Sequence, residues 1–296
     1  MIKLIFLGTS DAIPSIERNT TSILLSYKDE NILIDCGEGT QRQLRKANFN
    51  PCKITKILIS HWHGDHILGL PGLLQTLSFS GYNKSLEIYG PRGTKNLMKA
   101  LLKTFVFQEK IKLTVKEVEN RFFESEDFYL EAEHMTHGTP CNAYTFVKKK
   151  SLRIDKKKLE KTKISGPLLK HLKEGKNIVY DGKTYFSKDM TFEETDKKIS
   201  FVFDTSFNER IIPFVINSDI LVCESTFGSE LEERAEDYKH LTVKQTARIA
   251  KESKSKKLIL THISQRYSKN PQVLLKDAKK IFRNSVLAKD FDRFDI

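Results

Sequence analysis

The residues with the clearest chemical potential lie in the segment 60–66 (SHWHGDH), which holds three histidines and one aspartate. It follows the apolar run 57–59 (ILI), so we expect a strand that ends where the polar segment begins. Imidazole and carboxylate groups together suit zinc or another first-row divalent ion. Histidines in polar turns also pair simply with carboxylates, but that alternative suits an isolated histidine better than a cluster. The segment therefore predicts a metal site.

The spacing within this segment indicates two metal ions. His61 and His63 share one face of an extended chain, because side chains alternate along a strand. Asp65 and His66 follow Gly64 and can turn toward a second ion. An open catalytic ion takes about three protein ligands, so four ligands in one segment fit half of a two-metal site.

Composition favours a folded protein without membrane spans. Hydrophobic residues make up 39% of the 296 residues and charged residues 30%, enough for one large domain or two small ones. No apolar run approaches the roughly 20 residues that a membrane span needs, so no membrane partner is expected. The segment 1–14 soon meets Gly8 and Asp11, which predicts a first strand rather than a signal peptide. The four cysteines form no C-x-x-C pair, which favours reduced thiols and a cytoplasmic location.

The positive charge is concentrated in one stretch of the chain. The net charge is +12, which suggests a polyanionic partner such as nucleic acid, although a lysine-rich proteome would explain it equally well. Residues 148–183 hold thirteen Lys or Arg against four Asp or Glu, and so carry +9 of that charge. Runs this dense are usually solvated or flexible segments.

Hydrophobic patterning predicts an α/β chain in which strands, loops and helices follow one another. Strands are expected at 2–7, 22–27, 32–34, 86–89, 111–118, 127–134, 199–203, 257–260 and 286–296. Helices are expected from about 41, and at 68–80, 94–104, 243–253 and 271–282, with Thr242 as the N-cap of the helix at 243.

Several motifs together resemble the metallo-β-lactamase superfamily, and within it the short form of ribonuclease Z, over the whole chain. Besides residues 60–66, these are the D-x-G-E-G-T turn at 35–40, G-L-P-G at 69–72, Glu224-Ser-Thr-Phe at 224–227 and His262 with Arg266 and Tyr at 262–267. The resemblance implies an αβ/βα sandwich of four layers, with two facing sheets and helices outside. It also implies that Asp35 braces the metal histidines as a hydrogen-bond acceptor.

The resemblance implies a ligand set for two zinc ions per subunit. His61, His63 and His137 would hold one ion, Asp65, His66 and His262 the other, and Asp204 would bridge them. Of the two histidines in the segment 133–140, His137 has the family's spacing to Tyr144, and His134 is left as a polar residue on a strand. The chain has Val202-Phe203 where the family has Ser-Gly before the bridging aspartate.

Catalytic and substrate-binding roles are also implied by the resemblance. Asp65 would orient the attacking water and accept its proton, and His240 would protonate the leaving oxygen while a carboxylate, for which Glu224 is the candidate, holds it. Alternatively, His240 satisfies backbone groups at the start of a helix. The implied substrate contacts are Arg18 and Asn19 in the loop P-x-K-x-R-N (here with Ile16 in place of Lys), Thr242, Arg266, Gly166 and Pro167.

The basic stretch resembles the arm with which ribonuclease Z holds tRNA. The resemblance implies a single domain over 1–296 with an inserted basic tRNA-binding arm at 148–190, and a homodimer. It further implies that the protein removes the 3′ trailer of precursor tRNA after the discriminator nucleotide. The products would be a 3′-hydroxyl on the tRNA and a 5′-phosphate on the trailer.

Two other functions compete with this interpretation. A zinc phosphodiesterase that acts on small esters such as cyclic nucleotides would need the metals but not the basic arm. An RNA-binding module with structural zinc would need no water-activating site, which the filled ligand positions argue against. A β-lactamase explains neither the arm nor the region around His240.

Overall fold

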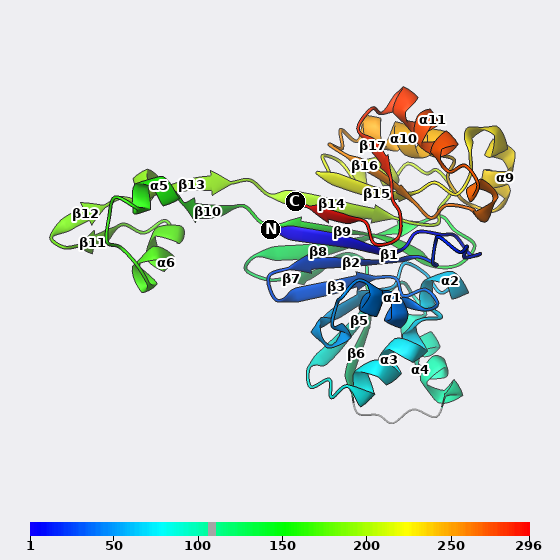
Figure 1. Cartoon of the computed structure of the whole chain (residues 1–296), viewed down its shortest axis with the longest axis horizontal. Coiled ribbons are helices and arrows are strands. Elements are labelled where there is room, and N and C mark those ends of the chain that lie inside the picture. The colour runs from blue at the N-terminus through cyan, green and yellow to red at the C-terminus, as the bar shows by residue number, and fades with distance from the viewer. Residues whose placement is uncertain (106–110) are drawn as a thin grey trace.

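A computed structural model describes residues 1–105 and 111–296, which form two seven-stranded sheets packed face to face (Figure 1). In sheet order, the first consists of β18 (Arg293–Asp295), β1 (Ile2–Gly8), β2 (Ser22–Tyr27), β3 (Glu30–Ile34), β4 (Lys56–Leu58), β5 (Ser85–Gly90) and β6 (Lys112–Glu117). The second consists of β17 (Ser285–Leu287), β16 (Leu258–Thr261), β15 (Ile220–Glu224), β14 (Lys197–Val202), β9 (Cys141–Lys148), β8 (Phe128–Met135) and β7 (Asn120–Glu124).

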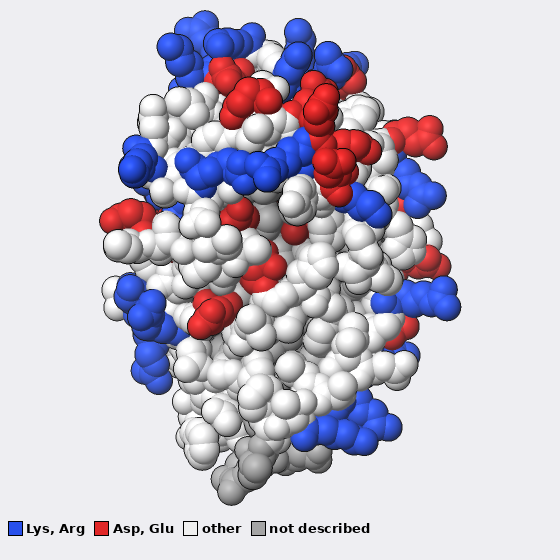
Figure 2. Space-filling model, turned by 90° about the vertical axis from the view of Figure 1, so that its right-hand side faces the viewer, with Lys and Arg blue, Asp and Glu red and all other residues white. Residues whose placement is uncertain are grey.

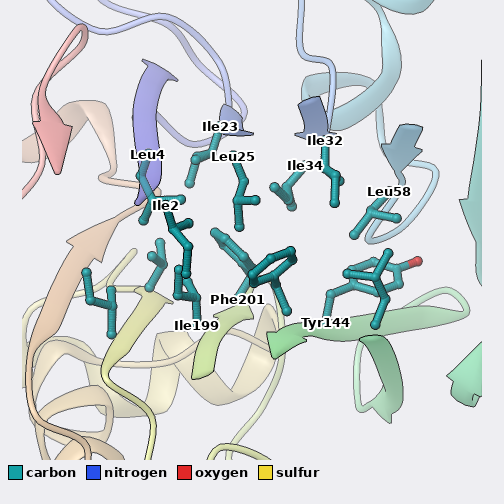
Figure 3. Packing of buried hydrophobic residues seen from close by; sticks show 14 of the residues in the cluster. Ile2, Leu4, Ile23, Leu25, Ile32, Ile34, Leu58, Tyr144, Ile199 and Phe201 are labelled. Carbon is teal, nitrogen blue, oxygen red and sulfur yellow. The ribbon is translucent and has the colours of Figure 1, made fainter. Parts of the chain in front are cut away.

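Apolar side chains fill the space between the sheets, because alternate residues of each strand point to the same face. Ile2, Leu25 and Ile34 of the first sheet pack against Tyr144 and Phe201 of the second (Figure 3). All five are almost fully buried. Sandwich packing thus makes the two sheets one rigid support for the loops at their edge.

Helices cover the outer face of each sheet and complete the four layers (Figure 1). The first sheet is covered by α1 (Thr40–Lys46), α3 (Leu70–Phe79) and α4 (Thr94–Thr104). The second is covered by α8 (Ile211–Phe214), α10 (Val243–Glu252) and α11 (Gln272–Ile281). Short α2 (Gly64–Ile67), α9 (Glu232–Asp237) and the 3₁₀ turns η1 (Pro51–Lys53), η2 (Ser229–Leu231) and η3 (Gln265–Tyr267) complete the sandwich. The predicted four-layer α/β sandwich is therefore confirmed.

The helix expected at 68–80 is present as α3, which begins after Gly69, where a side chain would collide with the backbone oxygen of Gly37. The last predicted strand was wrong. The strand expected at 286–296 is two strands in different sheets, β17 and β18. The chain turns between them at Phe291, whose φ is 70° and whose N–H donates to the carbonyl of Phe6.

The segment between β9 and β14 leaves the sandwich and projects away from it (Figure 1, green). A two-stranded stalk, β10 (Ser151–Ile154) and β13 (Thr191–Glu194), carries a knob made of α5 (Lys156–Leu159), α6 (Pro167–Lys173), the hairpin β11 (Ile178–Tyr180) and β12 (Lys183–Tyr185), and α7 (Ser187–Met190). Ile164, Leu172, Ile178 and Met190 form a small apolar core inside the knob. The projection thus has packing of its own, even though its surface is rich in lysine. No helix among the described residues is long and apolar enough to cross a membrane.

Candidate metal centre and active site

The predicted ligands converge because they follow strands that end at one edge of the two sheets. In the first sheet, parallel β3 and β4 are followed by Asp35 and by residues 60–66. In the second sheet, parallel β14, β15 and β16 end at or just before Asp204, Glu224 and His262. Neighbouring parallel strands bring their carboxyl ends together, so residues distant in sequence become neighbours here.

One group of side chains comprises His61, His63, His137 and Asp204, whose candidate ligand atoms all lie within 4.8 Å of one another. Nε2 of His61 lies 3.5 Å from Oδ2 of Asp204, and Nε2 of His137 lies 3.9 Å from the same oxygen. Nδ1 of His63 lies 3.1 Å from Nε2 of His137. Three nitrogen atoms and one carboxylate oxygen thus face a common point, as zinc ligands do.

A second group comprises Asp65, His66, His262 and the same Asp204, again with candidate ligand atoms within 4.8 Å of one another. Nε2 of His66 lies 3.1 Å from Oδ2 of Asp65 and 3.4 Å from Oδ2 of Asp204. Nε2 of His262 lies 3.1 Å from Oδ1 of Asp204. Since Oδ2 of Asp204 lies near histidines of both groups and Oδ1 lies near His262, this carboxylate is placed to serve both groups.

Several atoms at the centre lack the hydrogen bonds that buried polar groups normally make. Nε2 of His61, Nε2 of His66 and Oδ1 of Asp204 are buried and have no hydrogen-bond partner in the described part of the chain. Their neighbours lie 3.1–3.5 Å away, but without hydrogen-bond geometry. Imidazole and carboxylate atoms that are buried, convergent and unpaired fit divalent metal ions as their missing partners.

A layer of hydrogen bonds orients these ligands. Asp35 is fully buried and accepts hydrogen bonds from the backbone N–H and the hydroxyl of Ser60, both at 2.7 Å. Its Oδ2 lies 2.7 Å from Nδ1 of His66, which leaves Nε2 of that ring turned toward Asp204. On the other side, the Thr226 hydroxyl lies 2.8 Å from Nδ1 of His262. Outer hydrogen bonds of this kind fix the ring orientation and tautomer of metal-binding histidines.

The backbone is held in sparsely populated conformations at three of these positions. The φ angles are positive at Asp35 (57°), Asp204 (22°) and His262 (57°), a region that residues other than glycine seldom adopt. Each such residue costs on the order of 1–3 kcal/mol and persists only where the surrounding structure enforces it. The three conformations coincide with the convergence of the ligands, which connects the strain to the site.

At the centre, carboxylates and histidines stabilise one another's charged forms. Burial would raise the pKa of Asp204, but the nearby histidines, His262 first, hold it well below its usual range. Burial would lower the pKa of His66, but the surrounding carboxylates, Asp204 first, raise it well above its usual value. Burial lowers the pKa of His61. The carboxylates are therefore ionised inside a largely buried pocket, which attracts cations.

His240 and Glu224 form a pair beside the second group. Nδ1 of His240 lies 3.0 Å from Oε2 of Glu224, which also accepts a 2.6 Å hydrogen bond from the Thr226 hydroxyl. The other oxygen of Glu224 accepts a 2.7 Å hydrogen bond from the backbone N–H of Thr205. Burial would lower the pKa of His240, but the charge of Glu224 and its neighbours outweighs burial and raises it to about 9. His240 is thus placed and charged to act as an acid.

These groups open into a cavity of about 770 Å³. Its walls include His63, Asp65, His137, Asp204, His240 and His262, together with Asp11, Ile13, Phe227, Tyr238 and Arg266. Figure 2 shows this face of the molecule, with acidic side chains in and around a central hollow and lysines and arginines around it. The candidate metal ligands thus line an open cavity rather than a closed core.

The other predicted site residues have varied surroundings. The guanidinium of Arg18 is buried and donates 2.7 Å hydrogen bonds to the Thr9 hydroxyl and the carbonyl of Ala288. The amide of Asn19 donates a 2.6 Å hydrogen bond to the carbonyl of Glu38. These hydrogen bonds of both residues stabilise the loop 9–20. Their contact with substrate phosphate stays a prediction.

Further residues divide between the sandwich and the arm. Thr242 caps α10 as predicted and forms a capping box with Gln245. Arg266 is exposed in the cavity wall, whereas Gly166 and Pro167 begin α6 in the knob, away from the metal centre. His134 lies outside both ligand groups, with Nε2 3.2 Å from Oε2 of Glu119. The hydrogen-bonding roles of Thr226 and Ser60 were missed, although both residues lie in quoted motifs, because a motif does not show which group a hydroxyl contacts.

The sandwich with histidine and aspartate ligands at one sheet edge defines a metallo-β-lactamase fold. The structure of YhfI, a metallo-β-lactamase fold protein from Bacillus subtilis, aligns with a TM-score of 0.71 at 20% identity over 99% of this chain and 98% of that one. Human tRNase Z, short form, aligns with a TM-score of 0.72 at 26% identity over 99% of both chains. The fold and its ligand clusters together indicate a metal cofactor.

Curated relatives identify the family. Ribonuclease Z of Prochlorococcus marinus (strain MIT 9301) is 41% identical over 98% of both chains, and ribonuclease Z of Bacillus cereus (strain B4264) is 38% identical over 100% of this chain and 99% of its own. The chain therefore belongs to the ribonuclease Z family. A family model described as anti-Pycsar protein Apyc1 also matches residues 2–274, a range that contains both ligand groups.

Proposed function

We propose that this protein is a zinc-dependent endoribonuclease that removes the 3′ trailer from precursor tRNA. The observation that carries this proposal is the pair of ligand groups that share Asp204, next to the His240–Glu224 pair, in a chain whose relatives are ribonucleases Z. A two-metal centre suits phosphodiester hydrolysis, in which an attacking and a leaving oxygen must both be stabilised.

His61, His63 and His137 would hold one zinc ion, Asp65, His66 and His262 the other, with Asp204 between them. When bound, the two ions would supply an activated water at neutral pH and stabilise the charge that develops on the phosphate. Asp35 and Thr226 keep His66 and His262 turned toward the centre. The protein's own task is therefore to fix seven ligands in place before the substrate arrives.

Proton transfer falls to two side chains in the cavity wall. Asp65 would orient the attacking water and accept its proton while the new oxygen–phosphorus bond forms. His240 would donate a proton to the 3′ oxygen as its bond to phosphorus breaks, and Glu224 would steady the imidazolium. The products are then a tRNA with a 3′-hydroxyl and a trailer with a 5′-phosphate.

The projecting segment supports an RNA substrate over a small one. Residues 148–183 carry a net charge of +9, and the knob presents Lys157, Lys170 and Lys173 on exposed surface far from the cavity (Figure 1). Lysines there would neutralise phosphates and release counterions, which gives affinity without reading bases. Because the arm points away from its own cavity, we propose a homodimer in which each arm holds the tRNA that the other subunit cuts. We place this activity in the cytoplasm.

Cleavage of a small phosphodiester is the second candidate, since such a substrate would need the two ligand groups but not the basic arm. The metal centre suits either substrate, so the arm decides between them. Under our proposal, deletion of residues 151–190 should sharply reduce cleavage of precursor tRNA while a small model diester is still hydrolysed. Undiminished cleavage of precursor tRNA by the deletion variant would contradict the role of the arm.

The direct test incubates the purified protein with a 3′-extended precursor tRNA, with and without a chelator, and maps the new 3′ end. We expect one cut after the discriminator nucleotide, its loss with chelator and its return with zinc. His66→Ala should still bind the RNA without cutting it. If the metal-loaded wild type bound RNA but cut none, the protein would be an RNA-binding module instead.

A further inference from the structure

An aromatic and cationic cluster beside His240 has no part in the proton transfers. Phe227 is nearly buried, and its ring centre lies 5.9 Å from that of His240. The ring of Tyr238 lies 6.3 Å from Phe227 at an interplanar angle of 34°, and is 60% exposed. The guanidinium carbon of Arg266 lies 5.5 Å from the centre of the Phe227 ring. All three residues line the cavity that holds the metal ligands.

Backbone hydrogen bonds hold the segments that carry Phe227 and Tyr238. The carbonyl of Phe227 accepts a 2.8 Å hydrogen bond from the N–H of Val243 at the start of α10, which holds the backbone that carries this buried ring. Tyr238 directly follows α9, and its N–H donates to the carbonyl of Arg234 at 3.1 Å. An exposed phenol and an exposed guanidinium thus lie beside one buried phenyl ring.

The charge of Arg266 is free for a ligand. Its Nε donates a 3.3 Å hydrogen bond to the Ser264 hydroxyl, and no ion pair joins it to a carboxylate among residues 1–105 and 111–296. An exposed tyrosine is ordinary by itself. An exposed tyrosine and an unpaired arginine that flank one buried ring in the wall of a catalytic cavity are a surface on which a nucleotide fits. Rings of this kind stack on bases, and arginine binds phosphate or lies over π-faces.

The position of His240 decides which nucleotide this surface meets. In the proposed reaction His240 protonates the leaving 3′ oxygen, which belongs to the last nucleotide of the mature tRNA. The base of that nucleotide is attached to the same ribose as the leaving oxygen, so it lies closest to His240 and to the rings beside it. The trailer, by contrast, leaves with the phosphate on the metal side.

We infer that Tyr238, Phe227 and Arg266 form a subsite for the nucleotide on the tRNA side of the cut, with its base stacked on Tyr238 and its backbone phosphate facing Arg266. This inference rests on the proposed function. Stacking accepts any base, because each base has a π-face. The subsite therefore holds the substrate in register at the cut without selecting one discriminator base over another.

The experiment is a double-mutant cycle between enzyme and substrate. Wild type, Tyr238→Ala and the ring-retaining Tyr238→Phe each cleave three precursor tRNAs: one intact, one abasic at the discriminator nucleotide and one abasic at the first trailer nucleotide. Removal of the discriminator base should slow the wild type and Tyr238→Phe by about tenfold, the typical effect of one stacked base. Tyr238→Ala should cleave the intact and discriminator-abasic RNAs at nearly the same rate. Thermal unfolding of the variants controls for loss of fold.

Two outcomes would overturn the subsite. If Tyr238→Ala slowed cleavage of the intact and the discriminator-abasic RNA by the same factor, Tyr238 would have only a structural role. If it lost discrimination at the first trailer nucleotide instead, the subsite would lie on the wrong side of the cut. In both cases the wild type still cleaves, so the proposed function would stand. Absence of any wild-type cleavage would remove the function and the subsite together.

Discussion

Substitution of Glu224 by glutamine should change the pH dependence of cleavage in a defined way. Glu224 is fully buried, accepts hydrogen bonds from Thr205 and Thr226, and lies 3.0 Å from Nδ1 of His240. Its charge is the first of the contributions that raise the pKa of His240 to about 9, against the lowering effect of burial. Glutamine is nearly isosteric with glutamate but neutral, so Glu224→Gln should return the pKa of His240 to its ordinary 6.5 or below.

The expected size of the effect follows from these two pKa values. His240 acts in its protonated form, which is therefore populated up to about pH 9 in the wild type and lost as the pH rises through the folded-state pKa. At pH 8 the protonated fraction would fall about 30-fold when the pKa drops from about 9 to 6.5, whereas at pH 6 it would change by less than about twofold. Bound cations would affect the pKa of His240 equally in wild type and in Glu224→Gln. The ratio of their cleavage rates therefore reports the effect of the Glu224 charge alone.

The assay is single-turnover cleavage of precursor tRNA between pH 6 and pH 9 by wild type, Glu224→Gln and His240→Ala. We expect the ratio of wild-type to Glu224→Gln rates to grow from near one at pH 6 to about 30 at pH 8. His240→Ala should lack this pH-dependent limb altogether. A Glu224→Gln defect of equal size at every pH would refute the reasoning, because it would mean that Glu224 acts through structure alone.

Three other predictions test the supports of the site and the arm. Glu194 lies 2.5 Å from Nζ of Lys148 and 2.6 Å from Nε of Arg153 at the root of the stalk. Because these pairs hold the root of the stalk and are worth at most about 1 kcal/mol, Glu194→Gln should raise KM for precursor tRNA by up to about fivefold and leave hydrolysis of a small diester unchanged. A matching loss on both substrates would argue against an effect on the arm. Burial raises the pKa of Asp290 from 3.8 to about 6, so its stabilising contribution is full below the unfolded value and is lost as the pH rises through about 6. The unfolding free energy of the wild type relative to Asp290→Asn should therefore increase by about 2 kcal/mol from pH 7 to pH 4 in urea titrations, and a pH-independent difference would show that Asp290 does not titrate in this way. Asp35→Asn should weaken zinc affinity about 10- to 100-fold in competition with a chromogenic chelator, and unchanged affinity would mean that Asp35 does not orient His66.

The candidate ligands in residues 60–66 could be predicted from residue types and spacing because their signal is local, whereas His137, Asp204 and His262 were implied by the family resemblance. The segment 60–66 places four ligand types in one short stretch, and His137, Asp204 and His262 each stand in a recognisable motif after an apolar run. Strand order then brings them together, since parallel strands end at a common edge. The convergence of these side chains could thus be predicted from the sequence, and their roles as metal ligands stay predictions.

Side-chain orientations and contacts between residues distant in sequence could not be predicted. A loop arginine such as Arg18 has the same sequence context whether its guanidinium is exposed to solvent or, as here, buried and bonded to the carbonyl of Ala288. Thr226 lies in the motif 224–227, but the motif does not reveal that its hydroxyl contacts both His262 and Glu224. The last strand prediction was wrong because apolar alternation does not record that the chain changes sheets at Phe291.

The central claim is that seven side chains hold two divalent ions on either side of Asp204. It is tested most directly by a crystal structure of the zinc-loaded protein, with anomalous diffraction measured on both sides of the zinc edge and the metal content measured in solution. We predict two anomalous peaks per chain, one within ~2.0–2.2 Å of ligand atoms of His61, His63 and His137 and one within the same distance of Asp65, His66 and His262. A single peak, or peaks away from Asp204, would contradict the account.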